Sequence, residues 1–278
     1  MTLGGSAGDR LEHTEPPGAR AAGQIVVVLP TYDEIGNLDT IADALLRLAL
    51  PDAAPLRLLI VDDASTDGTA EAADALARRH PDQVEVLHRT GKRGLGSAYL
   101  AGFAQALDGR ADLIVQMDAD LSHDPAALGA LIAAARDADL VIGSRYVAGG
   151  SVDTTWGWHR KWLSRFANRG VVPTLLALPL SDATGGYRVW RRETLARIAP
   201  AVTVHSSGYG FQVEMAYLAH RLGGRIREIP IHFRQRTAGR SKMSGVVALT
   251  AIMEIFAVRA RPGTRRAACG DSRREIST

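Results

Sequence analysis

Acidic side chains follow the ends of three apolar runs in this sequence. Asp118 and Asp120 come directly after one such run, in the stretch IVQMDADLSHDP at residues 114–125. The stretches PTYDE at residues 30–34 and VDDAS at residues 61–65 also end apolar runs. A single acidic stretch of this kind often caps a helix or solvates the end of a strand. Three of them at one place repel one another, because unpaired carboxylates are like charges.

A hard divalent cation would relieve that repulsion. Mg²⁺ and Mn²⁺ prefer oxygen ligands and are commonly shared between protein carboxylates and the phosphates of a substrate. We therefore expect Asp118 and Asp120 to hold Mg²⁺ or Mn²⁺ on a diphosphate. The alternative, that the acidic stretches only cap helices and solvate strand ends, stays open at this point.

Alternating strand and helix patterns would bring the acidic stretches together. Short apolar, β-branched runs predict strands, and helical spacing of apolar residues predicts helices. The predicted strands are residues 24–30, 56–63, 84–89, 112–118 and 138–146, and the predicted helices between them are residues 37–48, 68–80, 96–107 and 125–137. Near-continuous apolar strands separated by helices indicate a mostly parallel α/β sheet covered on both faces. Ligands of such sheets bind at the carboxyl ends of the strands, where all three acidic stretches lie.

The second half of the sequence continues this pattern with longer interruptions. A loop is expected at residues 147–158. The further predicted helices are residues 159–178, with a break at Pro173, residues 208–223 and residues 243–259, and the further predicted strands are residues 186–192 and 225–233. We expect one α/β domain at residues 23–260, with flexible tails at residues 1–22 and 261–278.

Charge and composition narrow the class of protein. The net charge is only +3, but no acidic residue lies between Asp153 and Asp182 or between Glu228 and Glu254, and both intervals carry basic residues. This asymmetry suggests a cation on one side of the site and phosphates on the other. The single cysteine, Cys269, permits no internal disulfide, which fits a reducing compartment. We see no signal peptide and no run of the ~18 apolar residues that span a bilayer.

Eight stretches follow one another in an order typical of one enzyme family. They are VVVLPTYDEIGNL, IVDDASTDGT, GLGSAYLAGF, MDADLSHDP, VIGSRYVAGG, RKWLSRFAN, SDATGGYRVWRRETL and GRSKM. Over about residues 24–258 the sequence resembles the dolichyl- and polyprenyl-phosphate mannosyltransferases, which are family 2 glycosyltransferases with the Rossmann-like GT-A fold. The stretches RKWLSRFAN and SDATGGYR distinguish this group from other family 2 enzymes.

The resemblance implies roles for individual positions. Contacts with the donor nucleotide-sugar are implied for Pro30, Tyr32, Glu34, Val61, Asp63, Asp118, Ala119, Asp120, Arg145, Arg236 and Lys242. Asp120 and Arg145 are the implied catalytic residues, and Arg236 and Lys242 lie on a loop that closes over the donor phosphates. The implied metal ligands are Asp118, Asp120 and Ser122. The family often has Gln at the last of these positions, where a serine hydroxyl is another oxygen ligand.

The acceptor side is implied to face a lipid. The segment at residues 154–170 contains three of the chain's four tryptophans, and Trp with Lys or Arg at helical spacing is typical of an interfacial helix. We expect Arg160, Lys161 and Arg165 to hold the acceptor phosphate, unless the segment is an ordinary amphipathic helix packed on the sheet. The apolar residues 246–258 either join it at the membrane or belong to the core.

The implied reaction is the inverting transfer of mannose from GDP-mannose to a polyprenyl or dolichyl monophosphate. The protein would then be cytoplasmic and peripheral on the cytoplasmic face of the membrane. The nucleophile is already an anionic phosphate oxygen, so no strong general base is required. Asp182 is expected to orient the sugar or to brace its loop. No nucleic-acid partner is expected.

Other functions stay open. The chain could transfer glucose or another sugar to a lipid phosphate, or bind a nucleotide-sugar without catalysis. A separate membrane protein could present the acceptor. A Rossmann dehydrogenase is disfavoured, because the first predicted strand is not followed by G-x-G-x-x-G. We interpret the Gly-rich stretch at residues 91–99 as a mostly structural turn, and we assign no role to the histidines, His123 included.

Overall fold

The computed structural model describes residues 23–51, 54–153, 164–166, 168, 170, 172–202 and 208–235. The two predicted tails, the predicted helix at residues 243–259 and most of the Trp-rich segment lie outside these ranges. The domain bounds therefore stay a prediction. Within the described ranges, no helix is both long enough and apolar enough to cross a membrane.

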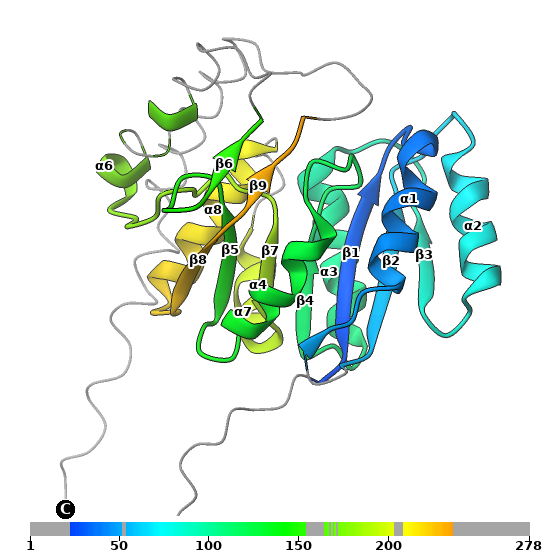
Figure 1. Cartoon of the computed structure of the whole chain (residues 1–278), viewed down its shortest axis with the longest axis horizontal. Helices are drawn as coiled ribbons and strands as arrows, with labels where there is room; N and C mark the ends of the chain where they lie inside the picture. Colours follow the sequence, from blue (N-terminus) through cyan, green and yellow to red (C-terminus); the bar gives the residue numbers. More distant parts are fainter. Residues whose placement is uncertain are drawn as a thin grey trace, which may run out of the picture.

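Seven of the described strands form a central sheet in the order β3-β2-β1-β4-β7-β5-β8 (Figure 1). Their bounds are β1 (Ile25–Thr31), β2 (Leu56–Asp62), β3 (Val84–His88), β4 (Leu113–Gln116), β5 (Leu140–Ser144), β7 (Arg188–Arg191) and β8 (Ile226–Pro230). Strand β7 runs antiparallel to both neighbours, and the other pairs are parallel. The predicted mostly parallel sheet is confirmed.

Helices cover both faces of this sheet, which explains why its strands are apolar almost throughout. The helices are α1 (Ile35–Leu46), α2 (Thr69–Arg79), α3 (Leu95–Asp108), α4 (Leu128–Ala134), α6 (Val172–Leu176), α7 (Arg192–Ile198) and α8 (Tyr209–Arg221). Because side chains alternate along a strand, Val26 and Val28 of β1 pack with α3, α7 and α8, whereas Ile25, Val27 and Leu29 pack with α1, α2 and α4.

Several elements differ from the sequence-based prediction. The helix expected at residues 125–137 begins with a 3-10 turn, Pro125–Ala127, and ends at Ala134. The strand expected at residues 225–233 divides after Pro230, and its second part, β9 (His232–Phe233), pairs with β6 (Ser151–Val152) in a separate sheet. Helix α7 was not expected, and it follows β7 directly.

The strand order places several loops at one edge of the sheet. Strand β1 lies between β2 and β4, so the carboxyl ends of these three strands are neighbours. Antiparallel β7 begins at this same edge, because Arg188 is the register partner of both Gln116 in β4 and Ile142 in β5. Open α/β sheets bind their ligands where the strand order reverses. In this sheet the order reverses next to β1.

Candidate active site

The tight turn after β4 holds Asp118 and Asp120 at the predicted edge of the sheet. Asp120 is buried, and its Oδ1 accepts hydrogen bonds from the backbone N of Ser122 at 3.0 Å and from the Ser122 hydroxyl at 2.5 Å. Leu121 between them has a φ of 61°, a left-handed conformation that reverses the chain at this point. Ser122 therefore fixes the Asp120 carboxylate, and its service as a metal ligand stays a prediction.

Two residues without an expected role hold Asp118 in place. The Tyr99 hydroxyl donates to Asp118 Oδ1 at 2.7 Å, and the Asp118 backbone N donates to Nδ1 of His123 at 3.2 Å. Burial raises the pKa of the Tyr99 phenol well above its ordinary value, and the Asp118 carboxylate raises it further. The hydroxyl therefore stays protonated and serves as a donor. The Tyr99 ring stacks with the rings of Phe103 and Phe211, and these contacts keep Tyr99 in this position.

The oxygen donors of this turn fit a hard divalent cation. Asp118 and Asp120 are carboxylates, and Ser122 adds a hydroxyl, which are the ligand types that Mg²⁺ and Mn²⁺ take. In the described ranges, three or more His, Cys, Asp and Glu side chains nowhere gather in a metal-binding cluster. A cation here would therefore complete its coordination with substrate oxygens and water, as Mg²⁺ commonly does beside phosphates.

Removing only the Tyr99 hydroxyl tests whether it orients Asp118. Tyr99→Phe should lower kcat about ten- to hundredfold, since a hydrogen bond to a charged group typically contributes about 1.5–3 kcal/mol. Tyr187→Phe is the matched control, because the buried Tyr187 hydroxyl has no hydrogen-bond partner among the described residues. Steady-state kinetics of both variants measure the effect on kcat, and thermal melting verifies that both are folded. Equal activity of Tyr99→Phe and wild type would contradict this role.

The loops after β1 and β2 bring together the residues implied for the nucleotide. Pro30 and Val61 are register partners on adjacent strands. Half-buried Glu34 accepts from Asn37 Nδ2 at 2.7 Å, and its backbone N donates to the Thr69 hydroxyl at 2.9 Å. These bonds hold the start of α1, and Ala119 is buried in the neighbouring turn. The structure thus gathers these positions at one edge, and their contact with a nucleotide stays a prediction.

The Gly-rich stretch at residues 91–99 contributes more than a turn. Asp63 is buried, and its carboxylate accepts from Arg89 Nη1 at 2.5 Å and from the backbone N atoms of Arg93 and Gly94 at 3.0 and 2.9 Å. Exposed Lys92 lies over the Tyr32 ring, with its Nζ 3.3 Å from the ring centroid. Asp63 therefore connects this stretch to β2, and Lys92 stands beside a residue implied for donor binding. These contacts agree with a mostly structural role, and a role of Lys92 at the donor stays a prediction.

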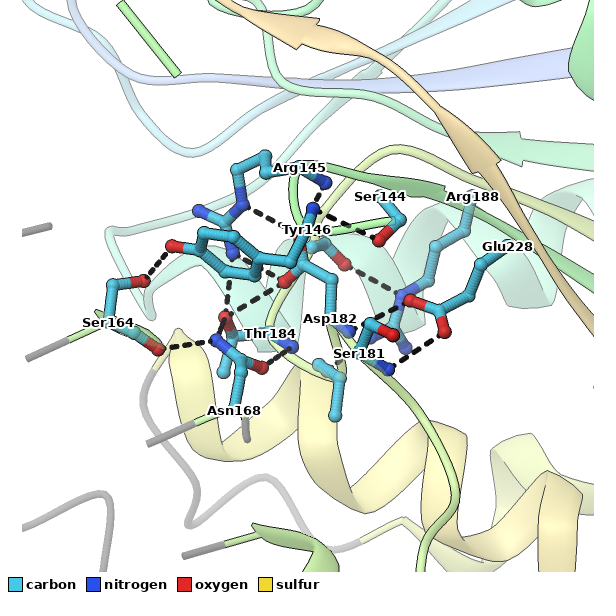
Figure 2. A network of polar contacts seen from close by, with 12 residues as sticks. Ser144, Arg145, Tyr146, Ser164, Asn168, Ser181, Asp182, Thr184, Arg188 and Glu228 are labelled. Carbon is cyan, nitrogen blue, oxygen red and sulfur yellow. Dashed lines mark hydrogen bonds and ion pairs between the residues drawn. The ribbon is translucent and has the colours of Figure 1, made fainter. Parts of the chain in front are cut away.

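Arg145 and Asp182 form a buried ion pair at the other half of the same edge (Figure 2). Arg145 Nε donates to Asp182 Oδ2 at 2.7 Å and Nη2 donates to Oδ1 at 2.6 Å, and the Arg145 backbone N also donates to Oδ2. Glu228 accepts from the backbone N atoms of Ser181 and Asp182, both at 2.8 Å. Asp182 thus braces Arg145 and its own loop, which is one of the two roles expected for it.

The predicted acceptor segment is joined to this network where it is described. The Asn168 side chain is buried, donates to the Thr184 hydroxyl at 2.9 Å and accepts from the Thr184 backbone N at 3.2 Å. The Tyr146 hydroxyl donates to Ser164 at 2.6 Å (Figure 2). Arg165 is exposed, as a phosphate-binding residue would be. The other expected phosphate ligands, namely Arg160, Lys161, Arg236 and Lys242, lie outside the described residues.

Sequence comparisons identify relatives over most of the chain. The family model described as glycosyl transferase family 2 matches residues 26–198. The undecaprenyl-phosphate mannosyltransferase of Micrococcus luteus is 45% identical over 232 residues, which cover 84% of this chain and 92% of that protein. The polyprenol monophosphomannose synthase of Mycolicibacterium smegmatis is 44% identical over 232 residues, covering 83% of this chain and 85% of that protein.

Solved structures show the same fold at lower identity. Glucosyl-3-phosphoglycerate synthase from Mycobacterium tuberculosis in complex with UDP has a TM-score of 0.64 and 20% identity, covering 88% of this chain and 83% of that chain. The same enzyme with Mn²⁺, UDP and glucosyl-3-phosphoglycerate has a TM-score of 0.63 and 19% identity, covering 88% and 82%. These likenesses establish that the architecture is a GT-A fold. They carry no argument about the substrates of this chain.

Proposed function

The chain belongs to glycosyl transferase family 2 and is a glycosyltransferase, and from this premise we propose that it transfers mannose from GDP-mannose to a polyprenyl monophosphate. The observation that carries the proposal is the 44–45% identity, over most of both chains, to two relatives named for mannosyl transfer to such lipids. The donor nucleotide and the need for a divalent cation are the finer parts of the proposal. They rest on the family resemblance and on the chemistry of the turn after β4.

The proposed reaction is a single displacement at the anomeric carbon of mannose. An oxygen of the acceptor phosphate forms the new bond to that carbon, the bond to the donor diphosphate breaks, and GDP leaves with the electron pair. The configuration is inverted. Because the attacking oxygen is already anionic at neutral pH, no side chain needs to remove a proton. The carboxylates described at this edge of the sheet already accept hydrogen bonds from neighbouring groups, and the reaction requires none of them to act as a general base.

The side chains have the tasks of placing the substrates and balancing their charge. Asp118 and Asp120 would hold Mg²⁺ or Mn²⁺, which when bound supplies positive charge to the leaving diphosphate. Arg145, oriented by Asp182, would align the acceptor phosphate. We assign Arg236 and Lys242 to the donor phosphates, and Arg160, Lys161 and Arg165 to the acceptor phosphate at a membrane surface.

The proposal predicts the outcome of a donor panel. Purified protein, a short polyprenyl phosphate and labelled nucleotide-sugars are incubated with Mg²⁺ or Mn²⁺, and label in the organic phase is counted. Only GDP-mannose should transfer label efficiently, and excess EDTA should abolish transfer. Transfer from a UDP-sugar instead would replace the donor in the proposal. Binding of GDP-mannose without transfer would favour a non-catalytic nucleotide-sugar-binding protein, and full activity in EDTA would reject the divalent cation.

A further inference from the structure

A buried chain of polar side chains ends beside Asp118. The Trp190 indole N–H donates to Gln116 Oε1 at 3.2 Å, and Gln116 Nε2 donates to Gln212 Oε1 at 2.7 Å. An indole N–H can only donate, so the carbonyl oxygen of Gln116 must face Trp190 and its amide nitrogen must face Gln212. Gln212 consequently directs its own carbonyl oxygen to Gln116 and keeps its Nε2 for another acceptor. Gln212 is only 3% exposed.

The Gln212 amide nitrogen borders a small space that Gly186 leaves open. A Cβ placed on Gly186 would lie 3.6 Å from Gln212 Nε2, 3.4 Å from Asp118 Oδ2 and 3.4 Å from His123 Cε1. These are ordinary contact distances, so a methyl group would fill the space without a clash. No residue in the described ranges accepts a hydrogen bond from Gln212 Nε2. The Gln212 Nε2 atom is not completely buried, so on the side of this space it can donate to water or to an acceptor that a ligand supplies.

The walls of this space are tied together from behind by Arg188. This fully buried guanidinium donates to the carbonyl oxygens of Gly185 at 2.8 Å, Ala183 at 2.7 Å and Gln212 at 2.8 Å. Figure 2 shows Arg188 beside the loop that carries Asp182 and Thr184. Burial lowers the pKa of Arg188 to about 9, against the opposing effect of Asp182, so it stays charged at neutral pH. The space is therefore formed before any ligand binds.

We propose that the space beside Gly186 is the subsite for the transferred sugar, with Gln212 Nε2 donating a hydrogen bond to one sugar hydroxyl. This inference rests on the proposed function and assigns its sugar-binding residue. A hydroxyl suits both walls, because it can accept from Gln212 and donate to Asp118 Oδ2. A phosphate oxygen can only accept and would be repelled by the Asp118 carboxylate. The N–H groups of Gln212 would oppose a cation beside them, so a cation held by Asp118 and Asp120 would lie outside this space.

Two variants test the subsite by equilibrium binding rather than by activity. Gly186→Ala fills the space with a methyl group and changes no charge. Gln212→Glu keeps the oxygen that accepts from Gln116 and replaces the amide donor with a second oxygen. Gly129→Ala is the matched control, because its Cβ would meet only Pro51, at 3.9 Å. Calorimetry with GDP-mannose and with GDP, at constant Mn²⁺, gives the ratio of the two dissociation constants for each protein.

We expect Gly186→Ala to weaken GDP-mannose binding about tenfold and GDP binding less than twofold, as the loss of a contact to the sugar requires. Gln212→Glu should also weaken GDP-mannose binding more than GDP binding. The added negative charge affects the binding of both ligands, so its general effect cancels in the ratio of their dissociation constants. Among deoxy analogues of GDP-mannose, one should bind wild type weakly and lose no further affinity in Gln212→Glu. That analogue identifies the hydroxyl. Gly129→Ala should match wild type for both ligands.

Three results would overturn the inference. Wild-type ratios in both variants would show that the space takes no part of the sugar. Equal weakening of GDP and GDP-mannose in Gly186→Ala would assign the space to the diphosphate instead. If wild type binds another nucleotide-sugar and not GDP-mannose, the proposed donor is wrong, and the same ratio measured with that donor against its own nucleoside diphosphate still tests the subsite. Gly186→Ala carries the test alone if Gln212→Glu melts well below wild type.

Discussion

Replacing Asp120 with asparagine is expected to lower mannosyl transfer about 100- to 1,000-fold, the size of loss seen when a central charge-stabilising group is removed. Asparagine has the shape of aspartate but no charge. Because Asp120 Oδ1 is held by two bonds from Ser122, the substituted side chain should keep its place and only the cation affinity should fall. Asp118→Asn should behave similarly, and it also places an amide opposite the Tyr99 hydroxyl. The measurement is label transferred from GDP-mannose to polyprenyl phosphate.

A control separates the site from general effects of charge. Asp137→Asn removes a carboxylate whose ion pair with Arg227 is exposed and 3.6 Å long, and it should leave transfer within about twofold of wild type. Mn²⁺ titrations of each variant add a readout that does not depend on turnover. Substantial transfer by folded Asp120→Asn, or saturation at wild-type Mn²⁺ concentrations, would remove Asp120 from the metal site.

Replacing Asp182 with alanine is expected to lower the free energy of unfolding by about 3–5 kcal/mol. Arg145 is buried, with a side chain only 5% exposed, and Asp182 is a carboxylate that balances its charge through two short bonds. Without it, a guanidinium stays in a poorly solvated place and the bond from the Arg145 backbone N is lost as well. Urea denaturation at neutral pH measures the change, and transfer should fall because Arg145 is no longer oriented.

The exposed ion pair between Asp39 and Arg79 provides the comparison. Its atoms are 2.8 Å apart, but its side chains are 67% and 55% exposed, so Asp39→Ala should change the free energy of unfolding by less than about 1 kcal/mol. A conservative variant, Asp182→Asn, should recover part of the stability, because it retains the shape and one oxygen acceptor. A loss at Asp182 no larger than that at Asp39 would show that the Arg145–Asp182 pair is not a buried brace.

Local patterns in the sequence were sufficient for the sheet and for the position of the acidic residues. Strands buried on both faces read as continuous apolar runs, and the carboxylates follow these runs directly. Asp118 and Asp120 could therefore be assigned to the ligand-binding edge, and that assignment agrees with the strand order. The ordered stretches also identified the family, because they preserve residue types and spacing along one chain.

The partners of those carboxylates were decided only by the tertiary structure. Tyr99 lies 19 positions from Asp118 in the sequence, and Gln116 lies 96 positions from Gln212. Apolar periodicity reports that a residue is buried, but not which residue it meets there. His123 showed no metal spacing and so received no role, although its ring accepts from the Asp118 backbone. The same limit applies to Asp182, for which the sequence left two roles open.

The position of β7 in the sheet is the main reason that the sequence did not reveal these partners. An antiparallel strand between β4 and β5 brings the loop of Asp182 and Gly186 to the edge that the earlier strands formed. Its direction and place depend on contacts between segments far apart in the chain, which a local pattern does not encode. Arg188 then binds that loop to α8 through three carbonyl oxygens, so Gln212 and Asp118 come to lie beside Gly186 only in the folded chain. Strand pairing, rather than residue type, thus determined which buried polar groups lie at the candidate site.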